Sequence, residues 1–143
     1  MKLLTIALDF DGTIARNDVL DPDVRKAIAD VRARGIVVIL VTGRILDDLR
    51  RVASDLYFID AVVAENGAVI EFPESGYSRV LGQPPPEVLL NELRREGISF
   101  AGGQSVIDAH ADTAPRILSI LQRLELPLVL AFNRCRAVAH RRF

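Results

Sequence analysis

Apolar runs that alternate with helix-like segments constrain the fold of this chain more than any other feature. Continuous apolar runs rich in β-branched residues predict strands buried on both faces, and apolar residues at helical spacing predict helices between them. The predicted elements are a strand at 3–8, a helix at 22–34, a strand at 36–41, a helix at 45–54 and a strand at 61–64. This order is typical of a parallel sheet covered on both faces, so the sequence predicts an α/β fold.

The rest of the chain predicts a second, smaller α/β module. Glu65–Gly67 is a turn signal and joins the third strand to a further strand at 68–72. Prolines and glycines mark loops over 73–86. Beyond them we expect a helix at 86–96, a strand at 104–108, a helix at 113–124, strands at 127–132 and 136–140, and a turn at 133–135. We therefore expect one domain at 1–80 and another at 81–143.

Polar clusters follow the three predicted parallel strands. They are Asp9–Thr13, Thr42–Arg44 and Glu65–Gly67. The carboxyl ends of parallel strands meet at one edge of a sheet, and ligands bind there in open α/β sheets. We therefore expect the three clusters to form one site.

A carboxylate pair at a strand end is costly unless a cation neutralises it. Asp9 and Asp11 could bind Mg²⁺, which takes hard oxygen ligands and a substrate phosphate. Asp9 could also attack phosphorus to give an aspartyl-phosphate. Asp11 is close enough to protonate the leaving oxygen and later to deprotonate water.

Small and polar residues around this pair suit the recognition of a phosphate. Gly12 permits a sharp exit from the strand, where exposed amides can cradle oxygens. Thr42 offers a hydroxyl and Gly43 an unobstructed amide, while Arg44 either holds substrate charge or pairs with a core carboxylate. The expected phosphate- or substrate-binding residues are Gly12, Thr13, Thr42, Gly43, Arg44 and Asn66.

Each cluster alone also has a simpler interpretation. An Asp-x-Asp pair occurs in sugar-nucleotide transferases and in calcium loops. Thr42 would merely cap a helix, and Glu65–Gly67 would be an ordinary turn. Their order, each after a buried strand, favours the shared site.

The same stretches resemble a known family. DFDGTIA at 9–15 and VILVTGR at 38–44 resemble the first two motifs of the haloacid dehalogenase-like (HAD) phosphohydrolases. VVAENGAVI at 62–70 is similar to the third-strand segment of their Cof-type branch, subclass IIB. The resemblance covers 3–72 and implies a Rossmann-like core that binds magnesium. Past residue 84 the chain is similar to the family's α/β cap, which covers the active site and selects the substrate.

The resemblance also implies roles for individual residues. Asp9 would be the nucleophile, Asp11 the general acid and base, and Thr42 a phosphate ligand. Asp9 and the backbone carbonyl of Asp11 would hold the metal.

Two motifs that the family needs are missing. One is a lysine that neutralises the nucleophile and the phosphate, and this chain has only Lys2 and Lys26, neither of them suitably placed. The other is a Gly-Asp-x-x-Asn-Asp-like loop that completes the magnesium site. Asp108 and Asp112 loosely mimic it; alternatively, Asp112 caps the helix near 113 and Asp108 is solvated. We therefore expect a partial core.

These features predict a Mg²⁺-dependent phosphomonoester phosphatase that is weak or inactive as this chain alone. The alternatives are a non-catalytic module that binds phosphate and magnesium or regulates, and half of a split phosphatase. A receiver-like phosphoacceptor domain fits less well, because Gly12-Thr13 and Thr-Gly-Arg argue against it. The expected substrate is a small sugar or acid phosphate. A sheet cut after its third strand exposes apolar edge and face, which predicts a homodimer or a complementing C-terminal fragment.

Composition narrows the partners and the compartment. The chain has 143 residues, half of them hydrophobic, and a formal net charge of −1. No global charge therefore favours nucleic acid or an acidic membrane. Cys135 is the only cysteine, which excludes an intrachain disulfide. No apolar run reaches membrane-spanning length, and we expect a cytoplasmic protein.

Overall fold

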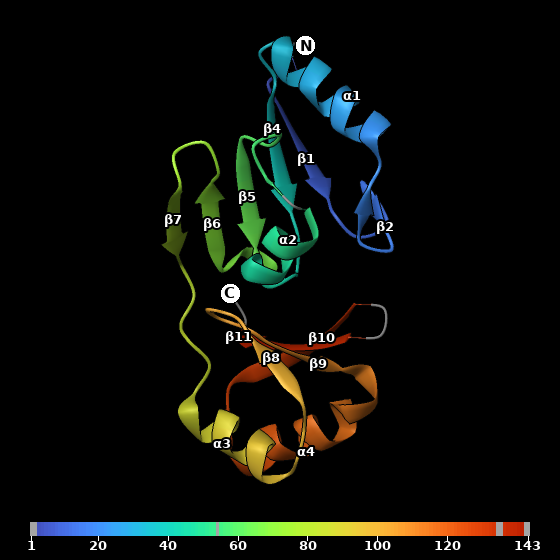
Figure 1. Ribbon diagram of the computed structural model, residues 1–143. Helices are drawn as coiled ribbons and strands as arrows, with labels where there is room; N and C mark the ends of the chain where they lie inside the picture. Colours follow the sequence, from blue (N-terminus) through green and yellow to red (C-terminus); the bar gives the residue numbers. More distant parts are fainter. Residues whose placement is uncertain (1–2, 54, 134–135, 142–143) are drawn as a thin grey trace. The chain divides into compact units, whose positions relative to one another are not determined.

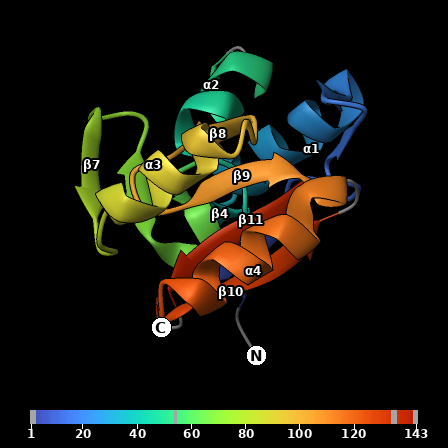
Figure 2. The same cartoon turned by 90° about the horizontal axis from the view of Figure 1, so that it is seen from below.

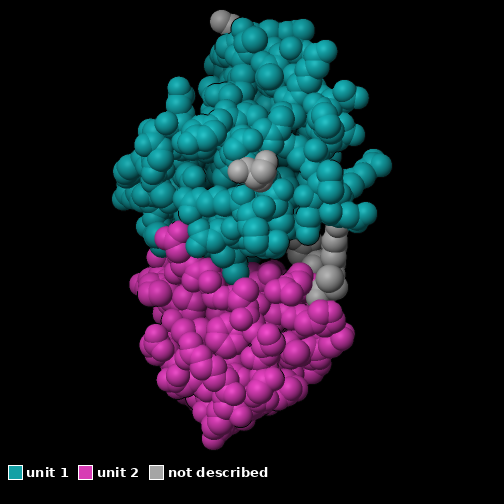
Figure 3. Space-filling view, viewed as in Figure 1, with its two compact units in different colours: residues 1–81 teal, residues 82–143 magenta. Residues whose placement is uncertain are grey.

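The chain divides into two compact units, residues Met1–Leu81 and Gly82–Phe143 (Figure 3). A computed structural model describes residues 3–53, 55–133 and 136–141 (Figure 1). Each unit has its own principal sheet and its own hydrophobic core.

Unit 1 is built on a five-stranded sheet in the order β1-β4-β5-β6-β7 (Figure 1). β1 and β5 both run parallel to β4, as the alternation of strands and helices predicts, whereas β6 and β7 add antiparallel. The strands are β1 (Thr5–Asp9), β4 (Val37–Val41), β5 (Ala61–Ala64), β6 (Val69–Phe72) and β7 (Tyr77–Val80). The expected α/β class is confirmed.

Both helices of unit 1 pack on one face of its sheet. They are α1 (Pro22–Ala33) and α2 (Leu46–Ala53), and each contributes to the core that contains Val38 and Leu40. Asp21 caps α1, because its carboxylate accepts a hydrogen bond from the Asp23 amide at 2.8 Å.

The prediction of a sheet covered on both faces is wrong for the described residues. On the second face, Val37 and Val41 remain 44% and 39% exposed. The run at 36–41 is apolar at every position, so its sequence predicts a strand that is buried on both faces. Such a run cannot indicate that helices cover only one face.

Two short features of unit 1 have no counterpart in the sequence-based prediction. β2 (Ala15–Arg16) and β3 (Val19–Leu20) form a small hairpin whose turn residues, Asn17 and Asp18, have φ of 49° and 65°. Two successive residues with positive φ are typical of a tight hairpin turn, and Asn and Asp tolerate that conformation. β7 lies within the expected loop at 73–86; all four of its residues are exposed, so it carries no apolar alternation to detect.

Unit 2 is a four-stranded antiparallel sheet in the order β10-β11-β9-β8. Apolar side chains of α3 and α4 pack with those of the sheet in one core, and α4 lies across β10 and β11 in Figure 2. The elements are α3 (Glu87–Arg95), β8 (Phe100–Gly102), β9 (Ile107–His110), α4 (Ala114–Arg123), β10 (Leu128–Asn133) and β11 (Arg136–Arg141). Single 3-10 turns, η1 (Glu65–Gly67) and η2 (Ala111–Thr113), precede β6 and α4.

Most of the elements expected in unit 2 are present. The strand expected at 104–108 is displaced to Ile107–His110, and β8 was not expected. The turn expected at 133–135 falls largely on residues outside those described. Among the described residues, no helix combines the length and the apolarity that crossing a membrane would require.

Candidate active site

The carboxyl ends of three parallel strands bring the predicted residues to one edge of unit 1. Asp9, the last residue of β1, pairs in register with Val41, which in turn pairs with Val63. Thr42 directly follows β4, and its amide donates to the carbonyl of Val63 at 2.9 Å. The strand-end clusters therefore lie next to each other.

Asp9 presents an accessible carboxylate. The residue is exposed, and its Oδ2 accepts one long hydrogen bond, at 3.3 Å, from the hydroxyl of Thr13. A carboxylate can accept several hydrogen bonds or metal contacts, so Asp9 retains most of its capacity. It is thus available for a cation or for reaction with a substrate.

The loop after β1 is held by the backbone of Phe10. The Phe10 side chain is fully buried, and its carbonyl accepts from the amides of Ile14 and Ala15 at 3.2 and 2.9 Å. Gly12 has φ of 80° and donates its amide to the Ala15 carbonyl at 2.9 Å, so that amide serves the turn. The Thr13 amide donates to no other described residue and is free for a ligand.

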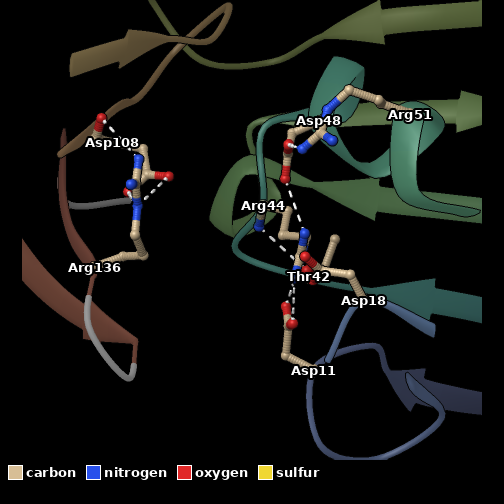
Figure 4. A network of polar contacts seen from close by, with 8 residues as sticks. All are labelled: Asp11, Asp18, Thr42, Arg44, Asp48, Arg51, Asp108 and Arg136. Carbon is tan, nitrogen blue, oxygen red and sulfur yellow. Dashed lines mark hydrogen bonds and ion pairs between the residues drawn. The ribbon is translucent and has the colours of Figure 1, made fainter. Parts of the chain in front are cut away.

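Asp11 is engaged by Arg44. Arg44 donates from Nε to Oδ2 at 2.8 Å and from Nη2 to Oδ1 at 2.7 Å, a bidentate arrangement (Figure 4). The same guanidinium pairs with Asp18 in the hairpin turn and with Asp48 of α2, the latter at 2.9 Å. Of the two roles considered for Arg44, the structure contains the carboxylate pairing.

The environment of Arg44 stabilises the protonated, charged form of its guanidinium. The hydrogen bond to Asp11 is the largest influence and raises the pKa of Arg44 above its ordinary value; burial opposes this, and Asp18 adds to the rise. The side chains of Arg44 and Asp11 are only 17% and 11% exposed. A pair this shielded from water interacts more strongly than an exposed one.

Two loops meet where Thr42 and Gly43 follow β4. The Thr42 hydroxyl, almost fully buried, accepts from the Arg44 amide at 3.1 Å and can still donate its own proton. The Asn66 amide donates to the Thr42 carbonyl at 3.3 Å. The Gly43 amide donates to no other described residue, so Gly43 and Thr13 offer free amides at this edge.

Asn66 and Glu65 both have left-handed backbone conformations, with φ of 56° and 54°. Glu65 is fully buried, and its Oε1 accepts from the amide of Leu46, the first residue of α2, at 3.5 Å. The Glu65 amide donates to the Arg44 carbonyl at 3.0 Å. The Glu-Asn-Gly tripeptide is thus a turn, as its composition suggests, and it also braces the loop that carries Gly43.

Sequence reasoning missed two residues of this site, Asp18 and Asp48; Glu65 belongs to a cluster expected there but was not among the expected binding residues. Asp48 was detectable, because it stands four residues after Arg44 at the start of a predicted helix. Asp18 follows Asn17 in a pattern that suits a tight turn. Neither signal identifies Arg44 as the shared partner, which depends on the packing of β1 against β4.

The residues present supply only some of the ligands that a magnesium site needs. The Asp9 carboxylate accepts only one long hydrogen bond, from Thr13, whereas both oxygens of Asp11 are bonded to Arg44. Within the described part of the chain, no group of three or more His, Cys, Asp or Glu residues is arranged to hold a metal. Mg²⁺ keeps several waters and often takes only one or two protein carboxylates, so this donor set suits it only when phosphate and further oxygens contribute.

Asp108 and Asp112 do not form an acidic pair in unit 2. Both oxygens of Asp108 accept from Arg136 Nε, at 2.9 and 3.0 Å, so the expectation of a solvated Asp108 is wrong (Figure 4). The N-cap of α4 is Thr113, not Asp112 as expected. Asp112 is exposed and pairs with His110.

Comparisons with known proteins converge on one family. The family model described as haloacid dehalogenase-like hydrolase matches residues 6–93. The 5-amino-6-(5-phospho-D-ribitylamino)uracil phosphatase YcsE of Bacillus subtilis (strain 168) is 36% identical over 66 residues, 46% of this chain and 26% of the relative. The putative phosphatase YxeH of the same organism is 34% identical over 70 residues, with the same coverage. The chain thus spans about a quarter of the length of these curated relatives.

Solved structures share the fold along almost the whole chain. A haloacid dehalogenase-like hydrolase from Bacteroides thetaiotaomicron superposes with a TM-score of 0.73 at 17% identity, covering 97% of this chain and 71% of that one. A haloacid dehalogenase-like hydrolase from B. subtilis gives 0.71 at 16% identity, with 98% and 74% covered. A sugar phosphatase of HAD subclass IIB gives 0.66 at 12% identity, with 97% and 70% covered.

Proposed function

The chain belongs to the haloacid dehalogenase-like hydrolases, and on that premise we propose that its strand-end site binds and hydrolyses phosphomonoesters. The observation that carries the proposal is the accessible carboxylate of Asp9 beside two free backbone amides, those of Thr13 and Gly43. A nucleophile flanked by amides suits a phosphoryl group, whose oxygens accept hydrogen bonds.

The proposed reaction has two steps. A carboxylate oxygen of Asp9 attacks phosphorus while the bond to the leaving oxygen breaks, which gives an aspartyl-phosphate. Asp11, once protonated and released from one of its two bonds to Arg44, donates that proton to the leaving oxygen, then takes one from the water that attacks phosphorus and releases Asp9 and phosphate. The Thr42 hydroxyl and the Gly43 amide hold the transferring group.

The charges at the site argue for a cation. Asp11, Asp18 and Asp48 all pair with Arg44, and Asp48 pairs with Arg51 as well. Asp9 adds a further carboxylate at the same edge, so that four carboxylates face two guanidinium groups. A phosphate dianion added to this excess of negative charge is repelled unless a metal ion neutralises it. We propose that Asp9 and the backbone carbonyl of Asp11 would hold Mg²⁺, which would offset the charge of the phosphoryl group.

We propose that this chain alone is a weak phosphatase. Its lysines are Lys2 and Lys26; Lys26 is an exposed residue of α1, and Lys2 lies outside the described residues. Loss of a cation that stabilises developing charge typically costs a large factor in rate. A complete site would need a cationic side chain and further metal ligands, both supplied by another segment.

Membership of the family supports a proposal for the substrate class and for the role of unit 2. We propose that unit 2 is a cap-type module that selects a small sugar or acid phosphate. The name of one relative, YcsE, includes a phosphorylated ribityl compound, which belongs to this class of substrate.

We further propose that the open side of the unit 1 sheet binds another polypeptide. β1 has β4 as its sole strand neighbour among the described residues, and Leu3 and Leu4 beside it are 53% and 61% exposed. Exposed edges and apolar faces favour association. A complementing C-terminal segment is favoured, because the solved neighbours are longer than this chain; a homodimer is the other candidate.

Hydrolysis of p-nitrophenyl phosphate with and without Mg²⁺ tests the catalytic part of the proposal. We expect slow, Mg²⁺-dependent turnover that Asp9→Asn abolishes and that the exposed control Asp112→Asn leaves unchanged. Fast turnover would show that the chain is complete without another segment. Binding of phosphate and Mg²⁺ without any turnover would favour the alternative function, a binding or regulatory module.

A further inference from the structure

Arg44 has few donors left for a substrate. A guanidinium has five N–H groups. Two of them, on Nε and Nη2, meet the oxygens of Asp11; a further one on Nη2 meets Asp18, and one on Nη1 meets Asp48. To bind a phosphate through more than its remaining N–H, Arg44 would have to release a carboxylate that it already holds.

The three carboxylates come from three different elements of unit 1. Asp11 follows β1, Asp18 lies in the turn between β2 and β3, and Asp48 lies in the first turn of α2. Arg44 itself precedes α2, and its guanidinium carbon lies 5.4 Å from the centre of the buried Phe10 ring. One face of the guanidinium therefore lies over the Phe10 ring, and the three carboxylates hold its N–H groups.

The β2–β3 hairpin needs such a tie more than the other elements do. It has two residue pairs, Ala15 with Leu20 and Arg16 with Val19, and a short isolated hairpin is only marginally stable. Val19 is 66% exposed, so one side of the hairpin contributes little burial. The ion pair from Asp18 to Arg44 links its turn to the end of β4.

We propose that Arg44 is a positioning residue that orients Asp11 and holds the β2–β3 hairpin beside it, rather than a cation that binds the substrate. The catalytic part of this proposal rests on the proposed function, in which Asp11 transfers the proton. Because Nη2 bonds to both Asp11 and Asp18, the two carboxylates are coupled through a single nitrogen. A change at the hairpin turn is thereby felt at Asp11.

Amide hydrogen exchange over residues 14–20, measured without ligand, tests the coupling. The variants are Asp18→Asn, Arg44→Gln and their combination; Asp47→Asn is the control, because Asp47 lies on the same helix, is exposed and pairs instead with Arg50. We expect exchange to be about three- to tenfold faster in Asp18→Asn and more than about tenfold faster in Arg44→Gln. The combination should exchange no faster than Arg44→Gln, because interacting residues are not additive.

Two further readouts separate positioning from a general loss of stability. Arg44→Lys keeps the charge but has no planar fork, so it should not restore the exchange rates of the wild type. The Nε–H resonance of Arg44 should move most in Asp11→Asn and less in Asp18→Asn, because Nε donates to Asp11 directly and senses Asp18 only through the shared guanidinium. If Arg44→Gln does not fold, the cycle of Arg44→Lys with Asp18→Asn replaces it.

Additive effects on exchange, unchanged exchange in Asp18→Asn, or full rescue by Arg44→Lys would each overturn the proposal. None of these results requires turnover. A chain that hydrolyses phosphomonoesters but has additive exchange effects refutes the positioning role and leaves the proposed function standing. A chain that has the coupling but does not hydrolyse phosphomonoesters supports the positioning role and refutes the proposed function.

Discussion

A Cβ atom on Gly43 would lie 2.7 Å from the carboxamide oxygen of Asn66, well inside van der Waals contact. The loop after β4 and the turn after β5 thus approach each other so closely that a side chain at residue 43 would require the Asn66 carboxamide to move. This close approach places the free Gly43 amide at the strand-end site.

Gly43→Ala should therefore displace the side chain of Asn66. We expect a loss of at most about 1 kcal/mol in the free energy of unfolding, because the end of the Asn66 side chain can turn aside. In the background of Asn66→Ala the same substitution should cost much less, because the clashing oxygen is gone. Urea unfolding of the two single variants and the double variant measures this; equal costs in both backgrounds would contradict the close fit.

Asp60 connects α1 to the start of β4. Its carboxylate accepts from the Val38 amide at 2.7 Å and from Arg32 at 2.7 and 3.0 Å. Burial opposes ionisation, but these hydrogen bonds outweigh it and lower the pKa of Asp60 below its ordinary value of 3.8. The stabilisation is therefore present above pH 3.8 and is lost as the pH falls through the lower pKa of the folded state.

Asp60→Asn should lower the free energy of unfolding by about 1–2 kcal/mol at neutral pH. The difference from the wild type should shrink in acid, since protonated Asp60 makes the same contacts poorly. Thermal unfolding over a pH series checks this, with the exposed Asp30→Asn on α1 as the control. A difference that stays constant down to the lowest pH would contradict the assignment.

The uncovered face of the unit 1 sheet should control self-association. Val41→Lys places a charge on the exposed face and should favour the monomer, with a change in stability below about 1 kcal/mol. Val38→Lys, on the same strand, should unfold the protein, because Val38 is 1% exposed. Light scattering during gel filtration measures the mass. If Val41→Lys alters neither the mass nor the binding of added segments, the face is not an interface.

Much of the fold was predictable because local signals and tertiary contacts agree. Asp21 and Pro22 mark the start of α1, and the predicted strand at 61–64 matches β5. The uncovered sheet face was not predictable, since an apolar run such as 36–41 has the same pattern whether one face is covered or two.

The site was predictable in position but not in its internal pairing. The rule that ligands bind at the carboxyl ends of strands brings Asp9 and Thr42 together from sequence alone. The link between Asp11 and Asp18 through Arg44 depends on where a long side chain reaches across two strands, which no local pattern encodes. Nor does spacing reveal that the amide of Gly12 is used by its own turn.

The proposed function depends most on the binding of phosphate together with Mg²⁺ at the edge beside Asp9. The amide resonances of Thr13 and Gly43, followed in ¹H–¹⁵N spectra during titration with both ions, test this binding directly. We predict that both resonances shift when phosphate and Mg²⁺ are present together, and that Asp9→Asn removes the shift. Resonances that stay in place at millimolar concentrations of both ions, or that shift equally in Asp9→Asn, would contradict the proposal.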